Sequence, residues 1–560
     1  MKILKSSKSL FVFYLLLFFV VNILQSIYTE LIDDEAYYWL WSKDLSWGYF
    51  DHPPMVALWI KISGFFFNGE LGVRFFSAFM FSFTLILIWK LIDIKTKWNN
   101  IHLFFLLITA VILFNFYGFI TVPDTPLFFF AVLFLYAYKL FLHNQNLKIA
   151  LLMGFAMAGM LYSKYHGVLV IGFVVVSNLS LLKKRYFWTA CLFALVLFTP
   201  HILWQYDNGF PSVLYHLNRS KKLYQWVFSV NHLLNQLLIV GLTFPVIYYA
   251  FFKADFKDRF NKALLFILVG FIGFFFMSTF KTSTQLQWTG IIVIPLIIMS
   301  FPYIITHQKS KKWFLILGSL NLIALLYIRL ASADDNLSFF KWETHQNKTW
   351  AQTLKENTGG LPIVFHNSFQ SASKYRFYTG IETYSYNALN YRQNQFDLPG
   401  YEKLVQGKTV YEVSNLEHGN VLSKKRNKIY YGSKIENYTT FQHLKCTINK
   451  DVLDLKLDEV YNLTFDLTNP YNKDIPISKL QFYGVFQTKK HQITAQVKLK
   501  NLTIVGLDST NMLRPFKNYK VRCSFDVPAH LDRSTTTFRM ALSFNNFKAG
   551  FEGNIVKIAF

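Results

Sequence analysis

Long apolar runs recur along the first 330 residues of this chain, and they constrain its fold more than any other feature. Hydrophobic residues make up 53% of the chain and charged residues only 16%, a composition more apolar than that of a soluble domain. A run of about twenty apolar residues can span a bilayer as a helix. We therefore predict a multi-pass α-helical membrane domain of about eleven transmembrane helices, near residues 9–27, 72–92, 101–118, 125–142, 149–162, 167–182, 186–203, 229–252, 263–279, 289–306 and 313–330.

The formal net charge of +25 would suggest nucleic acid as the partner of a soluble protein. Here much of the Lys and Arg lies in short loops between the apolar runs, and these loops alternate in charge, which predicts membrane orientation instead. We expect a multi-pass protein of the cytoplasmic membrane, with the N-terminus in the cytoplasm, the C-terminal part outside and no nucleic-acid partner. No small-residue cleavage site follows the first apolar run, so we expect it to stay attached. The basic loops contain Lys2, Lys5, Lys8, Lys90, Lys95, Lys97, Lys148, Lys183, Lys184, Arg185, Lys253, Lys257, Arg259, Lys262, Lys309, Lys311 and Lys312.

The composition changes near residue 331, where the apolar runs end. Residues 346–357 predict a helix that Gly359-Gly360 ends, and a short strand follows at 362–365. From about residue 450 apolar and polar residues alternate, which is typical of the strands of a β-sandwich. We therefore predict three parts: a transmembrane domain at 1–330, an extracytoplasmic α/β region at 331–445 and a β-sandwich-like domain at 446–560.

Three cysteines, Cys191, Cys446 and Cys523, show no metal-binding spacing. Cys191 lies inside an apolar run and is expected to be inert. Cys446 and Cys523 can pair if their domain is extracytoplasmic, and the sequence leaves this open.

Three adjacent carboxylates, Asp33, Asp34 and Glu35, directly follow the first apolar run, and Asp51 lies shortly after them. Because carboxylates are costly to hold near hydrocarbon, such a cluster indicates a functional site, and a membrane enzyme rather than a channel. A suitably placed carboxylate can remove a proton from an acceptor hydroxyl or amine. The alternative is a solvated loop that only ends a helix.

Other polar residues fall in the loops on the same predicted side. Asp51 and His52 precede Pro53-Pro54, so they are candidates to bind an acceptor or a metal, or else they belong to a rigid turn. Asp124 either caps a helix or lines the site. His166 is a further acceptor or metal candidate. The sequence does not decide whether a metal binds.

Cations on that side run against the general charge bias and therefore suggest an anionic ligand. Lys164 is suited to a lipid phosphate, although a lysine there can also snorkel to the interface without function. Arg219 offers a forked donor to phosphate oxygens, and Lys221 and Lys222 follow it. Lys281 forms a weaker third cluster with Gln287-Trp288.

Residues 10–330 resemble the GT-C superfamily of integral membrane glycosyltransferases. They are most similar to bacterial members of the family-39 protein-mannosyltransferase type and to the lipid A aminoarabinose transferases. The resemblance rests on five segments taken in order: Asp34 to Trp39, Gly48 to Pro54, Pro123-Asp124, Ser163 to Tyr165 and Trp204 to Arg219.

The resemblance implies inverting transfer of a sugar from a polyprenyl-phosphate donor to a lipid, glycan or protein acceptor of the cell envelope, by a monomer in the bilayer. It implies that Asp34 is the base, that Glu35 orients the acceptor or a metal, and that Lys164 and Arg219 hold the donor phosphate. The acidic triplet begins one residue early, so Asp33 stays an alternative base. Where many relatives have His-Trp, this chain has Gln287-Trp288. No cofactor is required, and a divalent metal remains an option.

Two other classes of function stay open. A transporter or flippase of lipid-linked sugars would use the same basic groove without a base. Transporters often carry internal repeats, and this sequence shows none. A structural envelope protein acting through its β domain would leave the outer acids unexplained.

Overall fold

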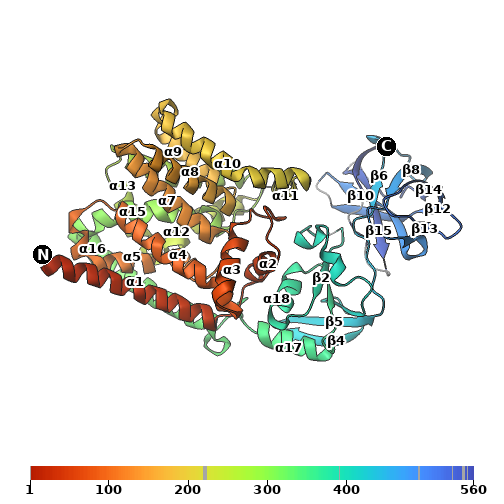
Figure 1. The fold of residues 1–560 in the computed structure, drawn as a ribbon, viewed down its shortest axis with the longest axis horizontal. Helices are drawn as coiled ribbons and strands as arrows, with labels where there is room; N and C mark the ends of the chain where they lie inside the picture. The colour runs from red at the N-terminus through yellow and green to blue at the C-terminus, as the bar shows by residue number, and fades with distance from the viewer. Residues whose placement is uncertain are drawn as a thin grey trace. The chain divides into compact units, whose positions relative to one another are not determined.

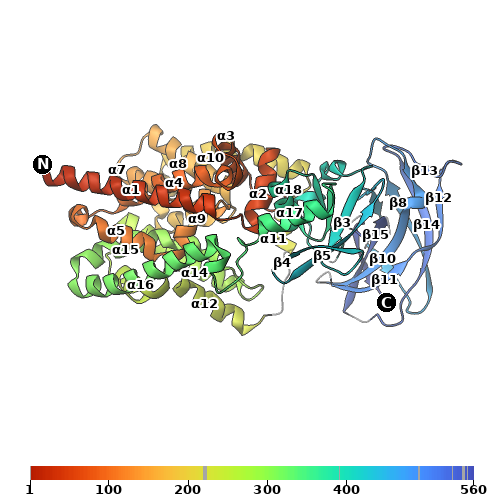
Figure 2. The same ribbon diagram turned by 90° about the horizontal axis from the view of Figure 1, so that it is seen from below.

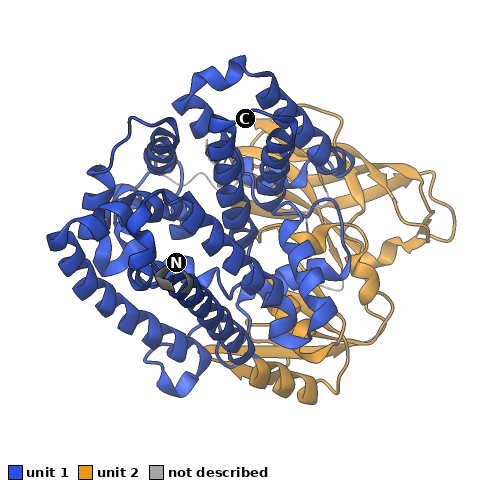
Figure 3. Ribbon diagram, turned by 60° about the vertical axis from the view of Figure 1, so that its left-hand side comes forward, with its two compact units in different colours: residues 1–347 blue, residues 348–560 orange. Residues whose placement is uncertain are grey.

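The structure is a computed structural model, and it describes residues 2–218, 224–389, 391–489, 492–531, 534–544, 549–550 and 553–560. The chain divides into two compact units, Met1–Asn347 and Lys348–Phe560, which Figure 3 colours separately. The first unit is helical and the second contains the β-sheets. The predicted fold class, a helical membrane domain followed by an α/β and β-sandwich region, is confirmed.

Apolar helices build the first unit. Within the described residues, eight of them have the length and composition of a membrane span, and four shorter apolar helices accompany them. The helices are α1 (Lys2–Tyr28), α2 (Asp33–Lys43), α3 (Met55–Phe66), α4 (Gly69–Leu91), α5 (Ile101–Ala110), α6 (Ile112–Phe116), α7 (Asp124–His143), α8 (Leu147–Ser163), α9 (Gly167–Ser177), α10 (Arg185–Asp207), α11 (Pro211–Asn218), α12 (Trp226–Val240), α13 (Phe244–Phe252), α14 (Arg259–Ser278), α15 (Val293–Thr306) and α16 (Gln308–Ala333).

The predicted number of about eleven spans is not confirmed, because several apolar runs are interrupted. The run at 101–118 forms α5 and α6, which separate at Val111. The run at 167–182 forms α9 only as far as Ser177, and a 3-10 turn follows. Helix α3, directly after Pro53-Pro54, was not among the predicted runs, because its twelve residues are too few to span a bilayer.

One row of helices, α1, α4, α7, α8 and α10, runs side by side through the unit (Figure 1). Small residues let them approach closely, as in other membrane bundles. A Cβ on Gly154 of α8 would lie 2.5 Å from the carbonyl oxygen of Ala190 in α10, and one on Gly159 would lie 2.2 Å from the ring of Phe130 in α7. Figure 2 shows α12, α14 and α16 on the other side of this row. Helix α8 ends at Ser163, and Lys164 follows directly.

The second unit begins with an α/β layer. Its five-stranded sheet has the order β2-β1-β3-β5-β4, with β1 parallel to both neighbours and β5 antiparallel to β3 and β4. The predicted helix, glycine turn and strand are present as α17 (Asn347–Asn357), Gly359 and Gly360 at positive φ, and β1. The elements are α18 (Phe369–Thr379), β1 (Ile363–His366), β2 (Thr383–Tyr386), β3 (Val410–Ser414), β4 (Asn420–Lys425) and β5 (Lys428–Ile435).

Two further sheets follow, in the orders β11-β10-β15-β16-β7 and β12-β14-β8-β6, with a short β13-β9 pair. Along β14 buried and exposed residues alternate over most of its length, as the period-two pattern predicted. The strands are β6 (Lys445–Thr447), β7 (Val452–Asp454), β8 (Val460–Thr468), β9 (Ile475–Pro476), β10 (Leu480–Thr488), β11 (Ile493–Lys498), β12 (Lys500–Val505), β13 (Met512–Leu513), β14 (Asn518–Asp526), β15 (Thr535–Phe544) and β16 (Ile555–Ala559).

The disulfide that the sequence left open does not form: Cys446 and Cys523 are both buried, and no disulfide joins them. Strand β8 lies between their strands, pairing Cys446 with Leu467 on one side and Cys523 with Leu463 on the other. Two interstrand spacings of about 4.8 Å already exceed the roughly 7 Å between Cα atoms that a disulfide can bridge. Burial raises the pKa of Cys523 to about 12, so this thiol is unreactive.

Candidate active site

The acidic triplet forms the first turn of α2, where carboxylates interact favourably with the helix dipole. Successive helical residues point about 100° apart, and the three side chains accordingly differ in burial. Asp34 is exposed, Asp33 is half-buried and Glu35 is fully buried. The triplet that looks uniform in the sequence therefore presents one carboxylate to the surroundings and one to the core.

Glu35 is held by Arg74 of α4 in a two-point ion pair. Nε and Nη2 of Arg74 donate to its two oxygens over 2.7 and 2.5 Å. The backbone N–H groups of Thr121 and Ile32 also donate to it, over 2.9 and 3.3 Å. The remaining N–H groups of Arg74 donate to the carbonyls of Ser26, Thr29 and Glu30. The pair joins the end of α1, the start of α2, α4 and the loop before α7.

Asp51 and His52 lie in the loop between α2 and α3, which folds back on the aromatic face of α2. The ring of Tyr49 stacks on Trp41 with centroids 4.5 Å apart. A Cβ on Gly48 would lie only 2.2 Å from the ring of Trp204 in α10, so this position requires glycine. Asp51 is buried and His52 half-buried. Tight packing on both sides fixes the position of this loop.

Three carbonyls of the same loop, two residues apart, accept hydrogen bonds from α10 and α11. Nδ1 of His201 donates to the carbonyl of Trp47 (2.7 Å), Oγ of Ser212 to Tyr49 (2.7 Å), and Nε2 of His216 to Asp51 (3.1 Å). We call these three contacts the carbonyl clamp. It ties the loop that bears Asp51 to the helix that leads to Arg219.

Tyr165, directly after Lys164, supports the clamp. Burial raises the pKa of Tyr165 to about 12, so its hydroxyl keeps its proton and donates to Nε2 of His201 over 2.9 Å. This fixes the proton of His201 on Nδ1, where Trp47 needs a donor. Nε2 of Gln205 donates to both Tyr165 and Ser212. The residue next to the predicted phosphate-binding lysine is thus part of the loop's support.

Lys164 and Asp124, both predicted site residues, are brought together. Nζ of Lys164 lies 2.8 and 2.9 Å from the two carboxylate oxygens of Asp124. The side chains are 8% and 10% exposed, so the pair is nearly but not fully sealed. Asp124 begins α7 and does not cap it with its side chain. Thr121, which contacts Glu35, lies only three residues before Asp124, so the two ion pairs meet on one short segment.

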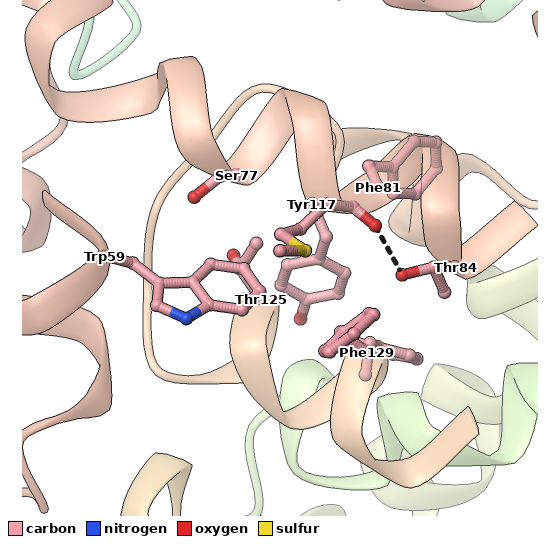
Figure 4. A pocket seen from close by; sticks show the side chains of 9 residues that line it. Trp59, Ser77, Phe81, Thr84, Tyr117, Thr125 and Phe129 are labelled. Carbon is pink, nitrogen blue, oxygen red and sulfur yellow. Dashed lines mark hydrogen bonds between the residues drawn. The ribbon is translucent and has the colours of Figure 1, made fainter. Parts of the chain in front are cut away.

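A small cavity lies beside this segment, between α3, α4 and α7 (Figure 4). It is lined by Trp59, Ser77, Tyr117 and Thr125 among others, and its volume open to a water-sized molecule is about 0 Å³. Ligand sites usually measure about 300–1,000 Å³. We therefore regard it as a packing defect beside the site rather than as the place of a substrate.

The other predicted residues are not all placed. His166 is half-buried, with its ring edge-on to those of Phe275 and Trp288. Lys281 is exposed in the connection after α14. Arg219, Lys221 and Lys222 lie outside the described residues. Among the described residues, no group of three or more His, Cys, Asp or Glu is arranged to hold a metal ion.

Arg74, Thr121, His201 and Ser212 were missed by the sequence reasoning. Arg74 carried a usable signal, because a charge within an apolar run is rare and needs a partner. The others are ordinary polar residues whose role depends on contacts with distant parts of the chain. Of these four residues, only Arg74 could have been predicted from the sequence.

An apolar helical bundle with buried ion pairs and an acidic turn at one end, followed by a sheet-rich unit, defines a multi-pass membrane protein with a polar site at one face. Comparisons with known proteins narrow this class. Residues 51–204, which include Asp51, Asp124 and Lys164, match the family described as dolichyl-phosphate-mannose-protein mannosyltransferase. No curated protein matches the chain in sequence.

Two solved structures of ArnT from Cupriavidus metallidurans share the fold. The apo form matches with a TM-score of 0.58 at 12% identity, covering 76% of this chain and 98% of ArnT. The form bound to undecaprenyl phosphate matches with a TM-score of 0.56 at 14% identity, covering 76% and 97%. The chain thus has the fold of ArnT, and the resemblance drawn from the sequence is confirmed.

Proposed function

We propose that this protein transfers a sugar from a polyprenyl-phosphate donor to an acceptor at the outer face of the cytoplasmic membrane. The Lys164–Asp124 pair carries the proposal. It places the cation of Lys164 at the end of an apolar bundle, and its partner Asp124 lies three residues after Thr121, which contacts the acidic turn of α2. A phosphate on a lipid chain needs such a cation at headgroup depth. The shared fold with a protein solved with undecaprenyl phosphate supports the same substrate class.

Lys164 is the proposed contact to the donor phosphate. An ammonium group carries three N–H donors, and two contacts to Asp124 leave one for a phosphate oxygen. Asp124 would hold the ammonium in place between reaction cycles. Arg219, Lys221 and Lys281 remain proposed partners of the same phosphate, from their place in the sequence.

Asp34 is the proposed base, because it is the exposed carboxylate of the triplet. It takes the proton of the acceptor hydroxyl or amine, whose electron pair then forms the new bond to the anomeric carbon. The bond from that carbon to the phosphate oxygen breaks on the opposite face, and the polyprenyl phosphate leaves with the electron pair. Cations stabilise the departing phosphate, and the anomeric centre is inverted.

Glu35 and the α2–α3 loop receive positioning roles in this proposal. Both oxygens of Glu35 are occupied by Arg74 and backbone N–H groups, so it orients the turn that bears Asp34. Asp51 and His52, held by the carbonyl clamp, are the proposed acceptor-binding side chains, with a metal as an alternative ligand. For the second unit we propose either a role in acceptor recognition or a purely structural role.

Replacing each acid in turn tests the base. Asp34→Asn should lower transfer by about 10²–10⁴-fold, the usual contribution of general base catalysis, with folding unchanged. Asp33→Asn is the matched control and should stay within a few-fold of the wild type. The opposite result would assign the base to Asp33, and full activity of both variants would remove the acidic turn from the chemistry.

Product analysis separates an enzyme from a flippase. Proteoliposomes are loaded with radiolabelled polyprenyl-phosphate sugar and supplied with extracted envelope lipids and glycans. A transferase releases polyprenyl phosphate and labels an acceptor, whereas a flippase only moves intact donor between leaflets. Mass spectra of envelope lipids and glycans from a deletion strain then identify the sugar and the acceptor, which decides between lipid A and other targets.

A further inference from the structure

A second polar feature lies at the other end of the membrane unit, in a groove between α13 and the first turns of α16. It is lined by Pro245, Val246 and Tyr249 on α13, and by Lys309, Ser310, Trp313 and Leu317 on α16. The cavity volume of the groove is about 540 Å³, which lies within the usual range of ligand sites. It is far larger than the cavity beside the candidate active site.

The groove and the acidic turn lie at opposite faces of the membrane unit. Arg329, near the far end of α16, donates to Asn22 near the end of α1, and α1 leads directly to the acidic turn. Lys309 and Arg329 are twenty residues apart on one helix, a rise of roughly 30 Å. That is the thickness of the hydrocarbon core of a bilayer. The groove therefore opens at the leaflet opposite the acidic turn.

Its walls combine an apolar surface with interfacial aromatic rings. Val246 and Leu317 supply aliphatic surface, and Tyr249 and Trp313 are about half exposed. Tyr and Trp with one side on an apolar groove and the other open are typical of the headgroup level of a membrane. An acyl chain fits such a wall better than water does.

The charge at the mouth of the groove is positive. Lys309 lines it, Lys312 follows on α16, and Nζ of Lys253 lies 5.6 Å from the ring centre of Tyr249. Among the described residues, no side chain caps the N-terminus of α16, and its first turn contains no acid. The first N–H groups of a helix need acceptors and attract anions. Lysine side chains and the first backbone N–H groups of α16 thus lie beside the apolar surface of the groove.

We propose that this groove binds an anionic glycerophospholipid of the leaflet opposite the proposed active site. The headgroup phosphate contacts Lys309 and the first turn of α16, and an acyl chain lies along Val246, Trp313 and Leu317. Basic pockets between helices are a recurring way to bind anionic lipid headgroups. The lipid fills the space between α13 and α16 and holds the two helices together. This inference does not depend on the proposed transferase activity.

Native mass spectrometry of the full chain in detergent tests the proposal, with three probes: phosphatidylglycerol, phosphatidylcholine and inorganic phosphate. Phosphatidylglycerol should bind at least about tenfold more tightly than phosphatidylcholine. Lys309→Glu should weaken its binding by about tenfold or more through charge repulsion. Lys148→Glu, an exposed basic-loop position outside the groove, is the matched control and should bind as the wild type does.

A second variant tests the apolar wall. Leu317→Trp should fill the groove and reduce phosphatidylglycerol binding while the melting temperature stays within a few degrees of the wild type. Three results would overturn the proposal: equal binding of the two lipids, unchanged binding in both groove variants, or inorganic phosphate binding as tightly as the lipid.

Discussion

The two ion pairs near the acidic turn differ in one decisive respect. The side chains of Glu35 and Arg74 are both 0% exposed, and all five N–H groups of the guanidinium have acceptors. Lys164 and Asp124 are 8% and 10% exposed, and the ammonium contacts only this carboxylate among the described residues. A saturated, sealed pair has no capacity for a ligand, whereas the second pair can exchange a partner. We infer that the Glu35–Arg74 pair has a structural role and that Lys164 of the second pair binds the donor phosphate.

Breaking the sealed pair should have the largest effect. Arg74→Met leaves the Glu35 carboxylate buried without its cation, and removing one partner of a buried pair costs about 3–5 kcal/mol. The midpoint of unfolding by SDS in mixed micelles measures this loss. Lys164→Met is the comparison and should cost less, because the Asp124 side chain is 10% exposed whereas that of Glu35 is 0% exposed.

A double variant separates scaffold from chemistry at this position. Arg74→Met with Glu35→Gln removes the uncompensated charge but keeps an oxygen for the N–H of Thr121, and it should regain part of the lost stability. Transfer activity in the refolded fraction should then persist. A stable but inactive double variant would return Glu35 to a direct chemical role.

Removing the charge of Lys164 should lower transfer activity and leave the stability of the fold nearly unchanged. Lys164→Gln should lower transfer by about 10²–10³-fold, the usual effect of deleting one donor to a developing anion. Its unfolding midpoint should stay close to that of the wild type. Lys164→Arg keeps the charge and should recover part of the activity. Asp124→Asn should lose less than Lys164→Gln, and a larger loss would make the carboxylate, not the lysine, the functional member of the pair.

The sequence predicted those features of the fold that depend on local composition, and it missed those that depend on contacts between distant residues. The apolar runs predicted the helical unit, because whether a helix can span a bilayer depends on the composition of that segment alone. The break at Val111 was missed because the residues around it are apolar, whereas the break after Ser177 lies at the polar residues Ser177 and Asn178, a signal that was not used. Period-two alternation gave the strands around Tyr519–Phe525, whose two faces differ in burial.

The candidate site divides in the same way. Asp124 and Lys164 were both named from local context, but their pairing depends on packing between α7 and α8 that no local pattern records. Glu35 was grouped with Asp34 because the two are adjacent. Helical geometry turns adjacent residues toward different surroundings, and Arg74 decides which of them faces the core.

The α2–α3 loop offers a smaller test, since it joins the scaffold to the proposed acceptor side. Gly48→Ala would place a methyl group 2.2 Å from the Trp204 ring, so the loop must shift. A misplacement of about 1 Å in a catalytic site can lower the rate up to about 10²-fold. Gly273→Ala, with no atom within 4 Å of the added Cβ, is the matched control and should be unchanged. Trp204→Ala in the Gly48→Ala background should restore part of the rate.

Single contacts of the carbonyl clamp should have the smallest effect. Ser212→Ala removes the hydrogen bond to the Tyr49 carbonyl and the acceptor of Gln205. One hydrogen bond contributes about 1 kcal/mol, so transfer should fall about fivefold. The loop keeps its other two carbonyl contacts, so the effect should be small. Because this loop bears the proposed acceptor-binding residues, the KM for the donor should change less than that for the acceptor. Ser180→Ala, in the 3-10 turn after α9, controls for loss of a serine hydroxyl. Equal changes in both KM values would mean that the clamp supports the whole site and not the acceptor loop alone.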